Sequence, residues 1–254
     1  MQYIAVILCL MAYHIHAAPA ETKYLAANVT KCSQEALEAG DCVATILNTL
    51  LPGLRNGDPE LNIPAYDPFV IDRLSFQYSS GAVSGRISVR NVELFGFADL
   101  KIQKVYIKSN SKKLQLKLQS FLPKMNIIGD YKADIHVNQL NLKPKGKFNL
   151  TLYDVENILT TEGEYYTKAD GLRFVRLVDI DTNPKIGNMI IKANGIFPDP
   201  ELDEIALNVA NSYWRDIYGI ILPETRKSWA PLLLRLINQS LMNVPIDQFI
   251  ESSD

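Results

Sequence analysis

Residue types that catalyse reactions or bind metals are scarce in this chain of 254 residues, which has three histidines and three cysteines. His14, His16 and Cys9 lie near the N-terminus, in or just after an apolar run that ends in small residues. This pattern is typical of a secretory signal peptide, which is removed from the mature protein. We expect residues 1–18 to be the signal peptide, with cleavage between residues 17 and 20, and residues 19–254 to form a single secreted domain.

Loss of the leader leaves His136 as the only histidine for acid–base chemistry, and its apolar neighbours in sequence place it on the solvent side of a strand. A Ser-His-Asp triad needs a histidine buried beside its nucleophile. The candidate Ser84 stands one position too late in residues 81–85 for a Gly-x-Ser-x-Gly turn. Neighbouring acids such as Asp203 and Glu204 fit a helix N-terminus better than carboxylate catalysis. We therefore predict no catalytic residues, no metal site and no cofactor.

Cys32 and Cys42 are the cysteines that remain, and in an exported protein they predict one disulfide. Closing so short a loop stabilises a fold by about 2.8 kcal/mol. A zinc site would need more ligands than the mature chain holds. Three Asn-x-Ser/Thr sequons, at Asn28, Asn149 and Asn238, are glycosylation candidates in a secreted protein.

The charge balance argues against a nucleic-acid partner, because 26 Lys and Arg residues stand against 28 Asp and Glu residues. Binding to a phosphate backbone depends on a basic surplus. The lysines of residues 143–147 predict a solvated hairpin turn, with contact to anionic lipid as the less favoured interpretation. Beyond the leader, no run of apolar residues is long enough to predict a membrane-spanning helix.

Alternating apolar residues dominate residues 68–197 and predict an almost entirely β region. The alternation changes parity after Val89 and again after Val137, which predicts β-bulges in long antiparallel strands. A sheet with several bulges is strongly bent, so we expect it to wrap around another element. Upstream of this region, Asp41 is predicted to cap a helix that ends at Pro52.

The last quarter of the chain is predicted to be helical, beginning at Asp199 and Pro200. Apolar residues from Leu202 to Ile220 fall on one helical stripe, which we expect to face the core. Pro223 is predicted to kink or restart the helix. Beyond it, apolar residues cover about twice the usual arc, so that part of the helix must be covered on more than one side. The sequence predicts an α+β fold in which a highly curved antiparallel sheet wraps a long C-terminal helix.

Aromatic and apolar residues on these elements are candidates for lining a cavity, although each could equally belong to an ordinary core. A long helix inside a curved sheet is not always packed by its own side chains, and the remaining space suits an elongated apolar guest. The candidates taken from periodicity are Phe148, Phe174, Tyr213, Ile217, Trp229, Leu233 and Leu236.

Several short segments spread over nearly all of the mature chain form a pattern in their order and spacing. They are the Cys32…Cys42 pair and residues 61–68 (LNIPAYDP), 89–96 (VRNVELFG), 129–131 (GDY), 145–148 (KGKF), 208–214 and 244–247 (VPID). In this pattern the chain resembles the insect haemolymph juvenile hormone-binding protein family, including its takeout-like branch.

The resemblance implies a tubular lipid-binding (TULIP-like) super-roll, with an internal tunnel for terpenoid or fatty-acyl ligands. It also implies that the protein is not an enzyme, and that the pair Cys32–Cys42 is the family's N-terminal disulfide. Tyr131 is carried over as a tunnel-lining candidate because its Gly-Asp-Tyr motif matches, and we expect its hydroxyl to contribute to selectivity.

Three functions are compatible with this sequence. The favoured one is an extracellular carrier that shields a small lipophilic ligand from water. The second is a lipid-processing hydrolase or isomerase that uses the same tunnel. The third is a module that makes a transient contact with a membrane or a receptor and holds lipid only as a structural component. No sequence pattern indicates an oligomeric state.

Overall fold

The computed structural model describes residues 31–33, 40–81 and 83–249 of the chain. The predicted signal peptide and the sequon at Asn28 lie outside these residues. The helices are α3 (Asp41–Leu50), α4 (Pro200–Ser212) and α5 (Trp214–Leu241), with short 3-10 turns η1 (Leu51–Leu54), η2 (Phe97–Asp99) and η3 (Ile246–Gln248). The strands are β1 (Phe69–Ser80), β2 (Val83–Phe95), β3 (Lys101–Ser109), β4 (Lys113–Val137), β5 (Leu140–Leu142), β6 (Lys145–Thr167), β7 (Arg173–Leu177), β8 (Asp181–Thr182) and β9 (Lys185–Ala193).

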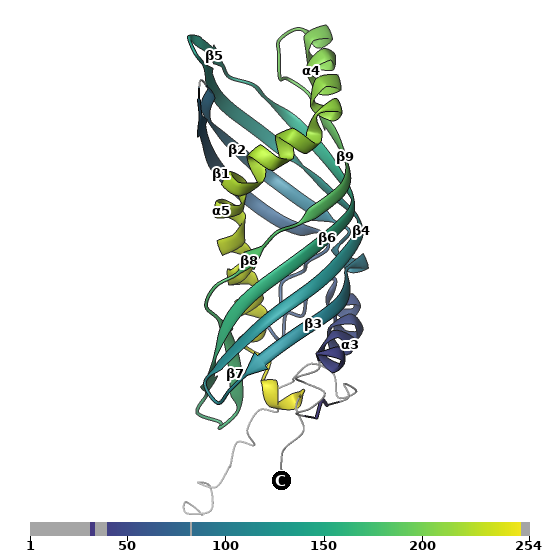
Figure 1. Cartoon of the computed structure of the whole chain (residues 1–254), viewed down its shortest axis with the longest axis vertical. Helices are drawn as coiled ribbons and strands as arrows, with labels where there is room; N and C mark the ends of the chain where they lie inside the picture. Colours follow the sequence, from purple (N-terminus) through teal and green to yellow (C-terminus); the bar gives the residue numbers. More distant parts are fainter. Residues whose placement is uncertain (1–30, 34–39, 82, 250–254) are drawn as a thin grey trace, which may run out of the picture.

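The strands of the described residues form one nine-stranded antiparallel sheet with the order β1-β2-β4-β6-β7. Strands β3 and β5 also pair with β4, and β8 and β9 pair with β6. Figure 1 shows the sheet curled into a half-barrel, with β4 and β6 running along most of its length and α5 crossing its open side. The predicted α+β class and the curved antiparallel sheet around a C-terminal helix are confirmed.

One predicted bulge bends the sheet. The register of β2 against β4 shifts between Arg90 and Glu93, and Asn91 adopts a left-handed φ of 50°. An extra residue on one strand locally disrupts the ladder and increases the twist. The parity change that follows Val89 is therefore a bulge, as predicted.

The second predicted bulge is wrong, and an unpredicted irregularity lies elsewhere. Val137 pairs with Leu140 across a two-residue turn that contains Asn138 at a φ of 53°, so the parity change there belongs to a hairpin. In the middle of β6, Asp154 adopts a φ of 52°. Apolar positions change parity at this point in β6 and near Pro123 in β4. In both long strands, the residues that face the interior are therefore even-numbered on one side of this point and odd-numbered on the other.

This switch divides the molecule into two ends, which Figure 1 shows at the bottom and top of the half-barrel. We call the first the α3 end: it holds α3, β3, β7, β8, the part of β4 before Pro123 and the part of β6 after Asp154. We call the second the α4 end: it holds α4, β5, β9, most of β1 and β2, and the remaining parts of β4 and β6.

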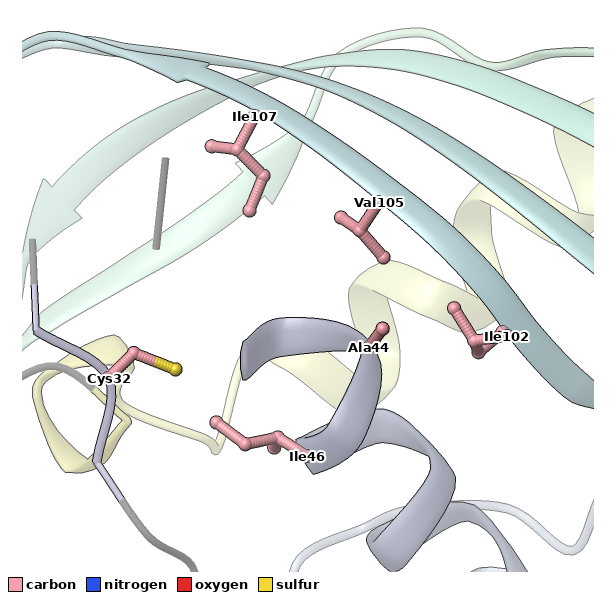
Figure 2. Close-up of a cluster of buried hydrophobic side chains, with 6 residues drawn as sticks. All are labelled: Cys32, Ala44, Ile46, Ile102, Val105 and Ile107. Atoms are coloured by element: carbon pink, nitrogen blue, oxygen red, sulfur yellow. The ribbon is translucent and has the colours of Figure 1, made fainter. Parts of the chain in front are cut away.

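The α3 end has a packed interior, in which α3 lies against β3. Figure 2 shows its largest buried cluster, formed by Cys32, Ala44, Ile46, Ile102, Val105 and Ile107. The predicted disulfide between Cys32 and Cys42 joins the segment before α3 to its first turn. A second buried cluster, of Leu122, Leu152 and Val155, lies at the boundary between the two ends.

The two predicted helix starts differ in outcome. Asp199 caps α4 as predicted, because its carboxylate accepts a hydrogen bond of 2.8 Å from the Glu201 N–H. Asp41 does not cap α3, since Gly40 takes the N-cap position and Asp41 lies in the first turn. A side chain at residue 40 would run into the Val105 carbonyl, and its φ is 77°, so glycine is required there.

The C-terminal helices break at Tyr213 and not at Pro223. Tyr213 leaves helical geometry, with φ −112° and ψ 23°, whereas α5 continues through Pro223 and Pro231. A proline inside a helix removes one backbone hydrogen bond. Next to this loss, the Thr225 hydroxyl donates to the carbonyls of Ile221 and Leu222, at 3.1 and 3.2 Å. The predicted restart at Pro223 is therefore wrong.

Candidate functional site

The apolar side of the sheet at the α4 end is the candidate binding surface. Charged, exposed residues occupy the alternate positions of the same strands, so this apolar side is the concave one that the helices cross. Cross-strand register groups its members into the rows Leu74–Val89–Tyr131, Phe76–Ile87–Ala133, Gly129–Phe148–Ala193 and Ile127–Leu150–Ile191.

These rows are only half-buried, with Ala133 as the exception. At the α3 end, by contrast, Val105, Leu122 and Val155 are between 2% and 6% exposed. The helices approach the sheet mainly at β1, β7 and β9, which flank the middle strands. The apolar rows of the middle strands therefore keep accessible surface beneath the helices.

The apolar stripe of α4, which the sequence predicts to face the core, is also accessible. Leu202, Ile205, Val209 and Tyr213 are between 47% and 60% exposed. These residues fall within about 80° of one another around the helix, at about 100° per residue. The α4 end thus combines an accessible apolar helix stripe with an accessible apolar sheet.

Polar contacts set the orientation of α4 and explain why its apolar stripe is not packed. The Asp203 carboxylate accepts hydrogen bonds from the N–H groups of Gly195 and Phe197, at 2.7 and 2.6 Å. About two turns further on, the Asn211 amide binds the backbone of Ile191. Because Asp203 and Asn211 point toward β9 and the loop after it, the apolar stripe lies on a different sector of the helix.

Asn211 and Asn238 form two matched clamps between the helices and the sheet edges. The Asn211 amide accepts from the N–H and donates to the C=O of Ile191 in β9, with both bonds 2.8 Å long. Asn238 in α5 makes the same pair of bonds to Leu177 in β7, again at 2.8 Å. Each side chain therefore satisfies a donor and an acceptor of an edge strand, as a neighbouring strand would.

The Asn238 clamp bears on the predicted glycosylation sites. Nδ2 of Asn238, the atom to which a glycan is attached, donates to the Leu177 carbonyl in the folded protein. The oxygen of Asn149 accepts from Asn126 at 2.6 Å, while its Nδ2 makes no hydrogen bond within the described residues. Of the two described sequons, Asn149 is therefore the one whose amide nitrogen is free.

The predicted lining residues lie in three settings. Phe148, on the apolar sheet side, is half-buried, as are Ile217, Trp229, Leu233 and Leu236 of α5. Tyr213 is 60% exposed at the junction of α4 and α5. Phe174 is 1% exposed in β7, where it stacks on Tyr166 at 5.7 Å between ring centres. Phe174 therefore belongs to the packed α3 end, while Phe148 lies at the accessible end.

Tyr131 lies on the apolar side of β4, where its hydroxyl donates to the carbonyl of Asn194 at 3.0 Å. Burial and, to a lesser extent, the Asp203 carboxylate raise the pKa of the Tyr131 phenol above its usual value. The phenol therefore keeps its proton, and that proton is directed at the backbone. A ligand carbonyl would have to compete with Asn194 for it.

A glycine next to Tyr131 makes room for Phe148. Gly129 pairs with Phe148 across the β4–β6 ladder. A Cβ atom on Gly129 would lie 3.0 Å from the Phe148 ring. The ring thus rests against the backbone of β4. The contact between Gly129 and Phe148, and the positions of the half-buried Leu74 and Phe76 on the same side of the sheet, were not among the sequence predictions. The sequence signal that could have placed them is the alternation of apolar and charged residues along these strands.

Two of the open hollows in the described part of the molecule lie at edges of the sheet. One, of about 460 Å³, separates β1 and β2 from α5 and is lined by Ser75, Phe76, Gln77, Arg86, Glu224, Lys227 and Ser228. The other, of about 320 Å³, lies over β6 and β7 at the α3 end. The first hollow adjoins the apolar row of Phe76.

The polar groups considered for catalysis have structural partners. His136 is half exposed and lies 3.3 Å from Asp134. Ser84 pairs with His136 in the strand register, but no hydrogen bond joins their side chains. Asp203 binds backbone N–H groups, as described above. No group of three or more His, Cys, Asp or Glu residues in the described ranges could hold a metal ion. Within the same ranges, no helix is long and apolar enough to cross a membrane.

Comparison with known proteins gives a consistent result. The family model described as haemolymph juvenile hormone binding protein matches residues 5–251. The chain is 22% identical over 221 residues to the circadian clock-controlled protein daywake of Drosophila melanogaster, and 23% identical over 224 residues to that of Drosophila yakuba. Each alignment covers 85% of both chains. The crystal structure of Epiphyas postvittana Takeout 1 superimposes with a TM-score of 0.74 at 19% identity, covering 87% of this chain and 99% of that one.

Proposed function

Because the chain belongs to the haemolymph juvenile hormone binding protein family, we propose that it is a secreted carrier of a small lipophilic molecule. The guest is terpenoid or fatty-acyl in character and lies at the α4 end, between the apolar rows of the sheet and the helices. The protein releases this guest chemically unchanged.

The observation that carries the proposal is the pair of accessible apolar surfaces at the α4 end. Leu150 and Phe148 on the sheet are half-buried, and Ile205 and Val209 on α4 are more than half exposed. Apolar surface left accessible inside a fold forgoes about 25 cal/mol per Å² that burial would supply. A lipophilic guest would bury the two surfaces together and recover that free energy.

The expected affinity follows from the size of the guest. Burying about 16 methylene groups supplies about 13 kcal/mol. Loss of translational freedom and ordering of side chains offset several kcal/mol or more of this amount. We therefore expect a dissociation constant of about 1 μM. Among the lining residues, Tyr131, Phe148, Ile217, Trp229, Leu233 and Leu236 remain candidates, whereas the buried Phe174 supports the packed end.

A substitution that fills the space tests the proposed site. Leu150→Trp places a larger apolar side chain between the sheet and the helices, so binding of a fluorescent fatty acid should weaken at least about tenfold, a loss of about 1.4 kcal/mol. Val178→Trp, at a residue 44% exposed beyond β7, is the control and should leave the affinity unchanged. Circular dichroism verifies that both variants fold. Equal affinity in Leu150→Trp and the unsubstituted protein would place the ligand elsewhere.

Native mass spectrometry of protein purified from its source identifies the guest. An extra mass that is lost on organic extraction is the expected result. For a carrier, an ester or epoxide added back is recovered intact, and His136→Ala changes nothing. Turnover of the added compound that disappears in His136→Ala would contradict the carrier proposal and favour the hydrolase alternative.

A further inference from the structure

The outer side of the sheet at the α4 end carries a surplus of positive charge. Its charged positions alternate with the apolar rows and lie side by side on β1, β2, β4 and β6. The six basic residues, which we call the cationic face, are Arg73, Arg86, Arg90, Lys132, Lys145 and Lys147, and all six are exposed. The acidic residues among them are Asp130 and Asp134, which leaves four positive charges in excess. The whole chain has a formal net charge of −2, so this surplus is a local segregation of charge.

Two cross-strand pairs in the cationic face have the same sign. Arg73 lies directly opposite Arg90, and Lys132 lies directly opposite Lys145. Like charges at directly opposite positions destabilise a sheet. Two such destabilising pairs therefore lie on this one surface.

The α3 end shows the usual arrangement on the same long strands. There Lys113 lies opposite Glu164, and Glu164 in turn lies opposite Arg176, with which it forms an ion pair at 3.0 Å. Glu156 lies opposite Lys185. Like-charge pairing is therefore a property of the α4 end and not of the sheet as a whole.

The acids of the cationic face lie directly opposite two of its arginines, Asp130 opposite Arg90 and Asp134 opposite Arg86, but neither acid forms an ion pair with an arginine within the described residues. Asp130 accepts a hydrogen bond from Asn91 at 2.8 Å and lies 3.8 Å from Lys147. Asp134 contacts His136. Arg73, Arg86 and Arg90 form no ion pair within the described residues, and a Gln77 amide turned with its oxygen toward Arg86 accepts from that guanidinium. The positive charges of the three guanidinium groups thus have no anionic partner among the described residues.

Hydroxyl groups and an open hollow lie among these arginines. Ser75 and Ser88 are opposite each other with their oxygens 2.8 Å apart, in the row between that of Arg73 and Arg90 and that of Arg86. The 460 Å³ hollow beside α5 is lined by Ser75 and Arg86, and on the helix by Lys227, which is ion-paired with Glu224 at 2.9 Å. Guanidinium and hydroxyl donors set around a hollow match the needs of a phosphate group.

We propose that the cationic face docks on a membrane surface rich in anionic phospholipids, with lipid phosphates bound near Arg73, Arg86 and Arg90. The basic residues are spread over four strands and several rows. This two-dimensional array matches the phosphates of a membrane surface better than the single row of charges on a linear polyanion. Leu140, at the β5 tip of the same end (Figure 1), is 56% exposed and supplies an apolar contact of the kind that lipid accommodates. The proposal does not depend on what the interior binds.

Vesicle flotation with the full mature chain tests this surface. The probes are vesicles of phosphatidylcholine alone and vesicles of equal parts phosphatidylcholine and phosphatidylserine. We expect binding to the second kind only, weakening as salt is raised. The double variant Arg90→Gln/Lys132→Gln should lower the partition coefficient by at least about tenfold. Its matched control is Lys108→Gln/Lys117→Gln, which removes the same charge at the α3 end, with Lys117 on the same strand as Lys132.

The outcomes separate the alternatives. Loss of vesicle binding in the first variant but not in the control supports docking through the cationic face. Equal loss in both variants would show a non-specific effect of net charge and overturn the proposal. Retention on heparin without binding to anionic vesicles would also overturn it, in favour of a sulfated polysaccharide. The fatty-acid affinity of the same variants, measured without vesicles, reports on the proposed carrier function separately.

Discussion

The two ends of the half-barrel share the strands β4 and β6 but differ in how their interiors are filled. At the α3 end, α3, β3 and the disulfide enclose side chains that are at most 9% exposed (Figure 2). At the α4 end, the sheet rows are half-buried and the apolar stripe of α4 is about half exposed. Their outer charges differ too, since charged cross-strand pairs are complementary at the α3 end, whereas the α4 end combines complementary pairs with two like-charge pairs.

The difference suggests a division of labour within one sheet. Hydrophobic burial stabilises a fold in proportion to the apolar area removed from water, and the α3 end provides most of it. Because β4 and β6 run through both ends, the packed α3 end also holds the strands of the α4 end in place, where apolar surface stays accessible. Rules of packing and charge pairing that hold at one end are broken at the other, which is where function is expected.

The largest expected effect is the loss of packing at the boundary of the α3 end. Leu122→Ala removes a side chain that is 3% exposed and should lower the free energy of unfolding by about 2–5 kcal/mol. Leu150→Ala, at the half-buried α4 end, should lower it by less than about 1.5 kcal/mol, because space already exists around the side chain. Urea denaturation of both variants without ligand measures the contrast. Equal losses would mean that the α4 end is packed as tightly as the α3 end.

Removal of the disulfide tests whether the α3 end provides the stability. Cys42→Ser opens the loop closed by Cys32 and should lower the free energy of unfolding by about 2.8 kcal/mol. Hydrogen exchange should increase in α3 and β3, with little change in α4 or β9. Treating the unsubstituted protein with a reductant is the control and should give the same pattern. An increase centred on α4 would contradict the division between the ends.

Much of this architecture is predictable from sequence, since alternation identifies the strands and helical spacing identifies α3 and the C-terminal helices. The parity switch at Asp154 is not predictable, because it depends on a left-handed φ that no local pattern requires. The bulge at Asn91 and the hairpin at Asn138 produce the same change in alternation. Only strand pairing distinguishes the two.

The orientation of α4 shows a second limit. Its apolar stripe predicts a buried face, but Asp203 and Asn211 satisfy backbone groups of β9 and the following loop, and these contacts place another sector of the helix against β9. Likewise Asn238 matches a glycosylation sequon, although its amide clamps β7. A sequence shows which side chains are polar; which distant N–H groups they satisfy is decided by the tertiary structure. The place of Phe148 on the apolar side of the sheet was predictable because strand alternation alone gives it, whereas Tyr131 was a candidate because its Gly-Asp-Tyr motif matches the family.

The two amide clamps offer a matched pair of substitutions. Asn211→Ala and Asn238→Ala each remove two hydrogen bonds to an edge strand and should lower the free energy of unfolding by about 1–3 kcal/mol. We expect Asn238→Ala to destabilise the protein against global unfolding, because β7 belongs to the packed end. Asn211→Ala should mainly speed hydrogen exchange in α4 and the release of a bound fluorescent fatty acid. Identical exchange patterns in both variants would indicate that the helices and both sheet edges open as one unit.

The smallest expected effect concerns the contact between Tyr218 of α5 and Pro184, just before β9. It shows whether this contact belongs to the packed end or to the accessible end. Tyr218 donates to the Pro184 carbonyl at 2.8 Å, and burial raises the pKa of its phenol from 10.0 to about 12. A raised pKa in the folded state means that the phenol stabilises the fold below pH 10 and loses that contribution as the pH approaches 12. The free energy of unfolding should therefore fall more steeply over this range in the unsubstituted protein than in Tyr218→Phe. Tyr106→Phe, at a residue 49% exposed on β3, is the control and should follow the unsubstituted curve. Parallel curves for all three proteins would mean that water reaches Tyr218 freely, and the accessible α4 end would then extend along α5 past Pro184.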